Sequence, residues 1–230
     1  MSVESHQANI AAVVDLIASR IKQDQRTVIA IAGPPASGKT TLAEAVVEHL
    51  NARSSSSDER PASLFPMDGY HLSNPELDSL GLRDRKGSCE TFDASGFCVA
   101  LERLCVLGTA HDLPGFDRDN DCVVPGAIRV GAHARIIVAE GNYLLLDRSP
   151  WREAQSHYTA RVFVKAPLAV LSMRLQERWR AQGLTARQAE ARVQLNDLPN
   201  ATLVLKDSTE ADLVLEHLVH DELEGVPASS

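Results

Sequence analysis

Two glycines, a lysine and a threonine at fixed spacing are the strongest chemical signal in the chain. The stretch "GPPASGKT", residues 33–40, matches the pattern G-x-x-x-x-G-K-[ST] without a mismatch. Gly33 and Gly38 let the backbone turn sharply and approach an anion without an intervening side chain. The backbone N–H groups of the loop then meet the positive end of the next helix, while Lys39 can reach terminal phosphates and the Thr40 hydroxyl can bind Mg²⁺. We therefore expect ATP to be held by Gly33, Pro34, Pro35, Ala36, Ser37, Gly38, Lys39, Thr40 and Thr41.

The segments on both sides of this loop have the pattern that such a site requires. Residues 28–32 form a short apolar run, typical of a strand that is buried on both faces. Leu42, Val46 and Leu50 then recur at helical spacing and predict an amphipathic helix. The alternative is a Gly/Pro turn that happens to precede Lys-Thr, but it does not explain a strand that enters the loop and a helix that leaves it.

A carboxylate follows the next expected strand. Residues 62–67 read as a strand that runs into "MDGYHL", which places Asp68 at the strand's carboxyl end. Ligands of open α/β sheets bind beyond the carboxyl ends of the strands, so Asp68 should face the same crevice as the phosphate loop. There it could orient and deprotonate an attacking hydroxyl group, as phosphoryl transfer requires. The alternative is a turn-forming aspartate before Gly69; the phosphate loop shifts the balance towards catalysis.

Several classes of nucleotide-binding protein are excluded by missing motifs. The guanine-reading N-K-x-D of GTPases and the L-S-G-G-Q of transporters are both absent from the sequence. What remains is small-molecule kinase chemistry.

The composition and net charge of the chain limit the classes of partner that it is expected to bind. The chain has 230 residues and a formal net charge of −8, which argues against electrostatic capture of nucleic acid or of an anionic membrane. No apolar run approaches the ~20 residues of a membrane helix, and the first residues lack the features of a signal peptide. We expect a cytoplasmic protein with a small-molecule substrate and no nucleic-acid or membrane partner. Whether it forms a homodimer is left open.

Expected strands alternate with expected helices along the chain. Further strands are expected at residues 135–139 and 161–165 and near the C-terminus, with an irregular hairpin at 113–134 and helices after Phe97, after Pro167 and at 185–195. This alternation predicts an α/β fold with right-handed crossovers and a mainly parallel sheet.

Six motifs together resemble those of the phosphoribulokinase/uridine kinase family. They are "GPPASGKTTLA", "FPMDGYHL", "RKGSCETFD", "LPGFDRDNDCVVPGAI", "IIVAEGNYLLLD" and "NDLPNATLV". The resemblance covers about residues 28–214 and is greatest with bacterial sugar-kinase-like and pantothenate-kinase-like members, some labelled fructokinase. It implies a three-layer α/β/α P-loop NTPase sandwich with a helical lid, ATP with Mg²⁺ as cofactors, and transfer to a substrate hydroxyl. We expect one kinase domain at 1–222, with the lid at about 174–196, and a C-terminal tail at 223–230.

The resemblance also implies roles for individual residues. Asp68 matches the family's base-like aspartate, and Glu140 matches the carboxylate of its "EG" motif. Glu140 could hold Mg²⁺ with Thr40, directly or through water; the alternative is a glutamate that only stabilises a helix N-terminus. Arg118 stands where relatives carry a histidine, which argues against a pyrimidine-nucleoside pocket. The expected substrate-binding residues are Tyr70, His71, Lys86, Phe92, Asp93, Phe116, Asp117 and Arg118.

An arginine-rich stretch matches the family's mobile lid. Arg174 and Arg178 are spaced i, i+4 and share a helix face, from which guanidinium groups could stabilise charge on the transferring phosphoryl group. The alternative for the other arginines of this stretch is a solvated helix face. The late motif residues Asn196, Asp197 and Asn200 match the family, but the sequence assigns them no role.

We therefore predict an ATP-dependent kinase whose catalytic residues are Asp68, Lys39, Arg174 and Arg178. A fructose-like sugar ranks first as acceptor because aromatic residues make up only 4% of the chain and offer few stacking partners for a base. The alternatives are a uridine or other nucleoside kinase, a pantothenate kinase, a nucleoside monophosphate kinase, and a regulatory ATP-binding NTPase without a small acceptor.

Overall fold

Five parallel strands form the central sheet of the computed structural model, which describes residues 3–54 and 60–216. Their order is β2–β5–β1–β6–β7. They span Ala62–Pro66 (β2), Ile136–Gly141 (β5), Thr27–Ala32 (β1), Ala160–Lys165 (β6) and Leu213–Glu216 (β7). The register of β1 and β5 sets Ile31 beside Glu140, so the carboxyl ends of both strands reach the same edge of the sheet. The predicted parallel α/β sheet is confirmed, while the predicted tail at 223–230 lies outside the described residues.

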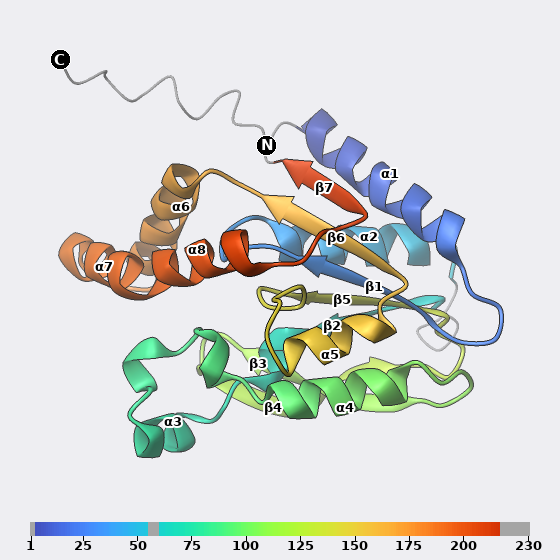
Figure 1. Cartoon of the computed structure of the whole chain (residues 1–230), viewed down its shortest axis with the longest axis horizontal. Coiled ribbons are helices and arrows are strands. Elements are labelled where there is room, and N and C mark those ends of the chain that lie inside the picture. The colour runs from blue at the N-terminus through green and yellow to red at the C-terminus, as the bar shows by residue number, and fades with distance from the viewer. Residues whose placement is uncertain (1–2, 55–59, 217–230) are drawn as a thin grey trace.

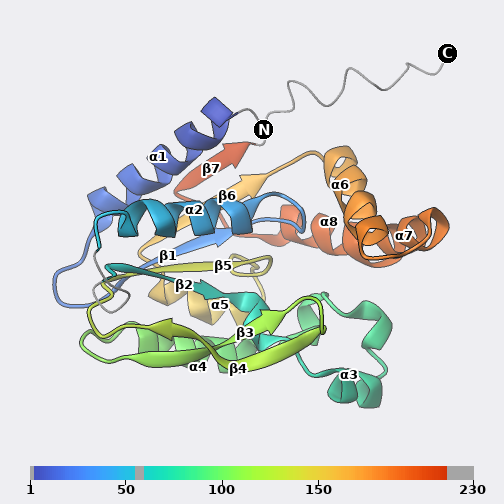
Figure 2. The same cartoon turned by 180° about the vertical axis from the view of Figure 1, so that it is seen from behind.

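Helices cover both faces of this sheet. The helices of the described residues are α1 (Val3–Arg20), α2 (Lys39–Asn51), α3 (Asn74–Leu80), α4 (Ala94–Leu104), α5 (Trp151–Ala154), α6 (Leu168–Ala181), α7 (Ala186–Arg192) and α8 (Leu198–Asp207), of which α3, α6 and α7 do not lie on the sheet. Ile29 and Ile31 of β1 pack with α1 and α2, whereas Val28 and Ala30 pack with α4 on the opposite side. Figure 1 shows α5 and α8 in front of the sheet, and the reverse view in Figure 2 brings α2 to the front. The three-layer α/β/α arrangement is therefore confirmed.

An antiparallel hairpin lies outside the central sheet. Its strands are β3 (His111–Asp117) and β4 (Cys122–Val130), with an irregularity between Leu113 and Gly115. The hairpin packs tightly on the turn that follows β2, because a Cβ atom on Gly69 would come within 2.2 Å of the Pro114 carbonyl oxygen. The predicted irregular hairpin is thus present, and it covers the turn that carries Asp68.

Helices α3, α5 and α8 were not expected from the sequence. Residues 74–91 looked turn-rich, but Ser73 and Glu76 form a capping box that starts α3. Helix α8 follows a π-helical turn at Val193–Asp197 and carries a proline in its first turn. Helices α6, α7 and α8 lie together at one end of the molecule (Figures 1 and 2). None of the helices at 3–54 and 60–216 is both long and apolar enough to cross a membrane.

A buried arginine joins three loops at the start of β1. The Arg26 side chain is 1% exposed and donates to four backbone carbonyl groups. These belong to Leu104, Thr109, Gly131 and Ala134, at distances of 2.6 to 3.3 Å. Arg26 therefore fastens the loops before β3 and after β4 to the central sheet.

We expect Arg26→Met to lower the free energy of unfolding by about 3 kcal/mol or more, because it leaves buried carbonyl groups without donors. Urea unfolding followed by circular dichroism would measure this. The control is Arg129→Met, which removes an exposed ion pair to Asp112 and should change stability by about 0.5 kcal/mol or less. Equal effects of the two substitutions would contradict the proposed role of Arg26.

Candidate active site

The phosphate loop connects β1 to α2 in the conformation that its glycines require. Gly38 has φ +92° and precedes the first turn of α2, which carries no acidic residue and no side-chain cap. A Cβ atom on Gly33 would come within 2.5 Å of the Val164 carbonyl oxygen. The amide groups at the start of α2 are therefore open to an anion, as residues 33–40 predicted.

A cavity of about 330 Å³ begins at this loop. Of the predicted nucleotide-binding residues, Gly33, Pro34 and Ser37 do not line it. Those that do are Pro35, Ala36, Gly38, Lys39, Thr40 and Thr41. The three residues that do not line the cavity are buried within the loop.

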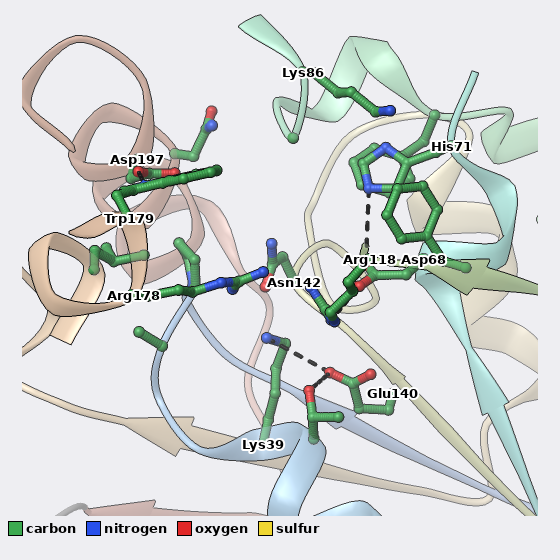
Figure 3. A pocket seen from close by; sticks show the side chains of 18 of the residues that line it. Lys39, Asp68, His71, Lys86, Arg118, Glu140, Asn142, Arg178, Trp179 and Asp197 are labelled. Atoms are coloured by element: carbon green, nitrogen blue, oxygen red, sulfur yellow. Dashed lines mark hydrogen bonds and ion pairs between the residues drawn. The ribbon is translucent and has the colours of Figure 1, made fainter. Parts of the chain in front are cut away.

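Lys39, Thr40 and Glu140 form a buried polar cluster at the floor of the cavity. The Thr40 hydroxyl lies 2.8 Å from Glu140 Oε1, and Lys39 Nζ lies 3.5 Å from the same oxygen (Figure 3). Burial raises the pKa of Glu140, and the Lys39 ammonium opposes this rise. A hydroxyl and a carboxylate converge here, and Mg²⁺ prefers such oxygen ligands together with substrate phosphates. The residues present therefore fit Mg²⁺.

Asp68 lies in the same cavity, in the turn Met67–Tyr70 that follows β2. Its Oδ2 accepts a hydrogen bond from Arg118 Nη2 at 2.7 Å, and its Oδ1 lies 4.0 Å from His71 Nε2. Both partners are side chains of the cavity wall and not backbone groups of the turn. Asp68 thus faces the crevice of the phosphate loop, as its position after β2 predicted.

An aromatic stack forms the wall beside Asp68. The His71 ring lies between Phe92, with ring centroids 4.0 Å apart, and Phe116, at 4.8 Å. The His71 side chain is only 10% exposed. Burial lowers its pKa to about 4, and the Asp68 carboxylate only partly offsets this effect. The imidazole is therefore neutral at physiological pH.

This lowered pKa predicts a specific loss of stability in acid. The unfolded chain gains the His71 proton near pH 6.5 and the folded chain only near pH 4, so the free energy of unfolding should fall between these values, by about 3 kcal/mol in total. His71→Phe should remove this part of the dependence. Urea unfolding between pH 7 and 4 would measure it, with the exposed His133→Gln as control. Identical pH dependence in the wild type and His71→Phe would contradict a neutral His71.

The Lys86 ammonium is hydrogen-bonded to neighbouring residues of the protein. Its ammonium donates to Asn74 Oδ1, to the Asp121 carbonyl and to Asp121 Oδ1, at 2.7, 3.0 and 2.7 Å. These bonds use all three N–H groups. Lys86 lines the cavity and lies over Phe116, but it has no donor left for an acceptor molecule.

Four of the predicted catalytic and substrate-binding residues do not line this cavity either. Tyr70 packs edge-on against Phe65 and Phe97, and burial raises its pKa to about 12. Asp93 caps α4 by accepting from the Gly96 amide. Asp117 accepts from the Asp119 and Asn120 amides in the hairpin turn. Arg174 reaches the outer side of the phosphate loop and donates to the Ala36 carbonyl at 3.3 Å.

The helical segment from α6 to α8 contributes residues to which the sequence assigned no role. Arg178 lines the cavity as predicted, together with Trp179, Arg192, Asp197 and Asn200. The Trp179 indole donates to Asp197 at 2.6 Å, and the Arg192 guanidinium lies 4.3 Å from the centre of the Trp179 rings. The hydrogen bond to Asp197 thus fixes the Trp179 ring. The Arg192 guanidinium lies over this ring in a cation–π contact and also lines the cavity.

The late motif also ties the lid to the rest of the site. Asn196, in the π-helical turn, donates to the Lys86 carbonyl at 3.0 Å, and Asn200 donates to Asn196. Tyr143 donates to the adjacent Gly87 carbonyl at 2.7 Å. The turn at residues 86–87 is therefore held both by the lid and by the segment after β5.

Asn142 is a further lining residue that sequence reasoning missed. It follows Glu140 and Gly141 at the carboxyl end of β5, and its side chain points into the cavity (Figure 3). The rule that placed Asp68, that ligands bind beyond the carboxyl ends of parallel strands, was the signal that could have identified Asn142.

The chain is similar to proteins that carry kinase names. It is 36% identical over 206 residues to a Schizosaccharomyces pombe protein named "Putative uridine kinase", covering 86% of each chain. It is 32% identical over 199 residues to an "ATP-dependent kinase" of Lachancea thermotolerans, covering 69% of this chain and 57% of that protein. Among solved structures, a "putative fructose transport system kinase" from Silicibacter sp. TM1040 has 37% identity and a TM-score of 0.82, covering 89% of this chain and 98% of that one. No protein-family model matches the chain.

Proposed function

The chain belongs to the uridine-kinase-like family of P-loop kinases, and on this premise we propose that it transfers the γ-phosphoryl group of ATP to a hydroxyl group of a small sugar-like acceptor. The observation that carries this proposal is the position of Asp68. Its carboxylate lines the same cavity as Lys39 and Thr40 of the phosphate loop. One cavity therefore offers a phosphate-binding end and a carboxylate that can accept a proton from a hydroxyl group.

At the phosphate end, the protein supplies positive charge and backbone donors. The amides of residues 33–40 and Lys39 bind the phosphates, and Arg178 with Arg192 approaches them from the lid. Arg174 braces the outer side of the loop through the Ala36 carbonyl. Thr40 and Glu140 would hold Mg²⁺, which when bound neutralises charge on the phosphate oxygens.

At the acceptor end, Asp68 orients the attacking hydroxyl group and takes its proton. Phosphoryl transfer requires little more than this positioning and charge stabilisation. Arg118 holds the carboxylate in place through its bond to Oδ2, which leaves Oδ1 to accept the hydroxyl.

The aromatic wall supports a sugar over a nucleoside. The Trp179 ring is covered by Arg192, and the His71 ring already lies against Phe92 and Phe116, the other rings of the cavity on which a base could stack. A nucleobase would have to displace His71 or Arg192, whereas a sugar needs only polar contacts and one apolar wall. The names of the relatives differ on this point, since one is called a uridine kinase and another a fructose transport system kinase.

Acceptor-stimulated release of ADP tests the proposal. Purified protein with ATP and Mg²⁺ would be incubated with D-fructose, D-ribose, D-glucose, uridine, cytidine, pantothenate or UMP, and ADP would be measured in a coupled assay. We expect at least one sugar to raise ADP release about tenfold or more over the acceptor-free rate, with a phosphorylated product found by mass spectrometry.

The other outcomes identify the alternatives. Stimulation by uridine or pantothenate alone would keep the kinase but replace the acceptor. Stimulation by UMP alone would indicate transfer to a phosphate group. An ATPase rate that no small molecule changes would favour a regulatory NTPase.

A further inference from the structure

Three of the residues that line the cavity have a buried polar atom without a hydrogen-bond partner in the described part of the chain: the charged Arg192, through Nε, and the uncharged Asn142 and His71. Asn142 Oδ1 and His71 Nδ1 are buried and have no hydrogen-bond partner among residues 3–54 and 60–216. Both residues line the cavity that also contains Asp68. Buried polar atoms are nearly always hydrogen-bonded in folded proteins. Unpaired polar atoms of residues in one cavity therefore indicate a ligand that supplies the missing hydrogen bonds.

The Asn142 side chain is held on a rigid support. Gly141 before it packs so closely on Met67 that a Cβ atom would come within 2.4 Å of that side chain. Tyr143 after it is fully buried and donates to the Gly87 carbonyl. Asn142 therefore projects from a fixed backbone, and its orientation does not depend on a hydrogen bond of its own.

His71 is fixed by packing and not by hydrogen bonds. Its ring is clamped between Phe92 and Phe116, and its side chain is nine-tenths buried. A neutral imidazole has one nitrogen that donates and one that accepts. Nε2 faces Asp68, and Nδ1 is the ring nitrogen that remains without a partner among the described residues.

The chemistry of the missing partner follows from these two atoms. The Asn142 oxygen needs a donor, and Nδ1 of a neutral histidine needs a donor or an acceptor according to its tautomer. A hydroxyl group supplies both, because it donates one hydrogen bond and accepts others. The neighbouring Lys86 is saturated by Asn74 and Asp121, so it does not compete for such a ligand.

We propose that Asn142 and His71 each bind a further hydroxyl group of the acceptor, in addition to the one that Asp68 activates. The acceptor is then a polyhydroxy compound with three hydroxyl groups on nearby carbon atoms, a sugar or a sugar alcohol. This inference rests on the proposed kinase function and names the features of the acceptor that the site selects.

Deletion of hydroxyl groups from the acceptor, combined with deletion of the two side chains, tests the inference. The probes are D-fructose, D-ribose and D-glucose with their singly deoxygenated analogues. With the wild type, removal of a recognised hydroxyl should lower kcat/KM about 10- to 100-fold. Asn142→Ala should lower kcat/KM for the parent sugar by a similar factor. In this variant, the deoxy analogue that lacks the hydroxyl bound by Asn142 should have the same kcat/KM as the parent sugar. His71→Phe, which keeps the aromatic stack, should do the same for a different analogue.

The control variant is Gln23→Ala, which removes an exposed carboxamide outside the cavity and should leave all rates unchanged. Two results would overturn the inference. One is a wild type whose kcat/KM is the same for the deoxy analogues and the parent sugars, as expected if only water is hydrogen-bonded to these two atoms. The other is an Asn142→Ala variant that loses the same factor with every acceptor, which would indicate a role towards ATP alone.

A binding measurement separates this inference from the proposed function. Isothermal titration of the protein with the same sugars, in the presence of ADP and Mg²⁺, requires no phosphoryl transfer. Binding that weakens at least tenfold for one deoxy analogue, and that loses this discrimination in Asn142→Ala, would support the inference even if no sugar were phosphorylated. Absence of both binding and turnover with all three sugars would refute it, while turnover with uridine or pantothenate would leave the kinase function intact.

Discussion

Replacing Asp68 with asparagine is expected to lower kcat/KM for the acceptor about 1000-fold while leaving the affinity for ATP within about twofold of the wild type. General-base catalysis contributes about 10²- to 10⁴-fold, and an amide of the same shape cannot take the proton of the attacking hydroxyl. The groups that would bind ATP are Lys39 and the loop amides, which line the cavity on a different element from Asp68. Initial rates at saturating ATP, together with ATP titrations of the free protein, would measure both effects.

The matched control is Asp112→Asn, which changes an exposed aspartate of β3 that pairs with Arg129. It should leave both quantities unchanged. Undiminished turnover in Asp68→Asn would remove Asp68 from the mechanism. Such a result would agree with transfer to a phosphate acceptor, which needs no carboxylate base.

Replacing Lys39 with methionine is expected to lower kcat/KM about 10²- to 10³-fold and to weaken ATP binding as well. Removal of one preorganised charge from a site that stabilises transferring oxygens has effects of this size. The Lys39 ammonium is largely buried and points into the cavity beside Glu140, so no other lysine of the cavity can replace it; Lys86 is held by Asp121. Steady-state rates and ATP titrations would again provide the measurement.

This substitution leaves Glu140 buried without its cationic partner, so a second variant separates catalysis from folding. Lys39→Met combined with Glu140→Gln removes the unpaired charge and should restore the stability of the protein but not its activity. Lys206→Met, at an exposed position of α8, is the control for loss of a lysine. Wild-type turnover in Lys39→Met would contradict the proposed phosphate site.

The sequence was sufficient for the phosphate loop and for the elements that carry it. An uninterrupted apolar run identified β1, and the rule for the carboxyl ends of parallel strands placed Asp68 in the crevice of the phosphate loop, whereas Glu140 was identified by the resemblance to the family's "EG" motif. The predictions of β1 and Asp68 depend on local patterns and on one topological rule, so a single sequence contains what they need.

The prediction for Tyr70 shows what local patterns miss. Met67–Tyr70 forms a 3₁₀ turn, in which residues three apart lie on the same side. Asp68 and His71 therefore share the face towards the cavity, while Tyr70 points into the core beside Phe97. The sequence "MDGYHL" contains no signal for a 3₁₀ turn, so Tyr70 could not be separated from His71 beforehand.

Contacts between distant segments account for the other unpredicted features. Asn196, Asp197 and Asn200 acquire their roles from Lys86 and Trp179. Lys86 is saturated by Asp121, which the hairpin brings across the cavity. Both sets of contacts appear only once the lid and the hairpin are packed beside the phosphate loop.

Transfer of radiolabel from [γ-³²P]ATP tests the central claim most directly. The protein would be incubated with labelled ATP, Mg²⁺ and D-fructose, D-ribose or D-glucose, and the products separated from ATP and inorganic phosphate. We predict that label appears in a sugar phosphate, and that Asp68→Asn abolishes this product without abolishing ATP binding. Label found only in inorganic phosphate, at a rate that no acceptor and no change at Asp68 alters, would contradict the claim that Asp68 delivers a hydroxyl group to the bound triphosphate.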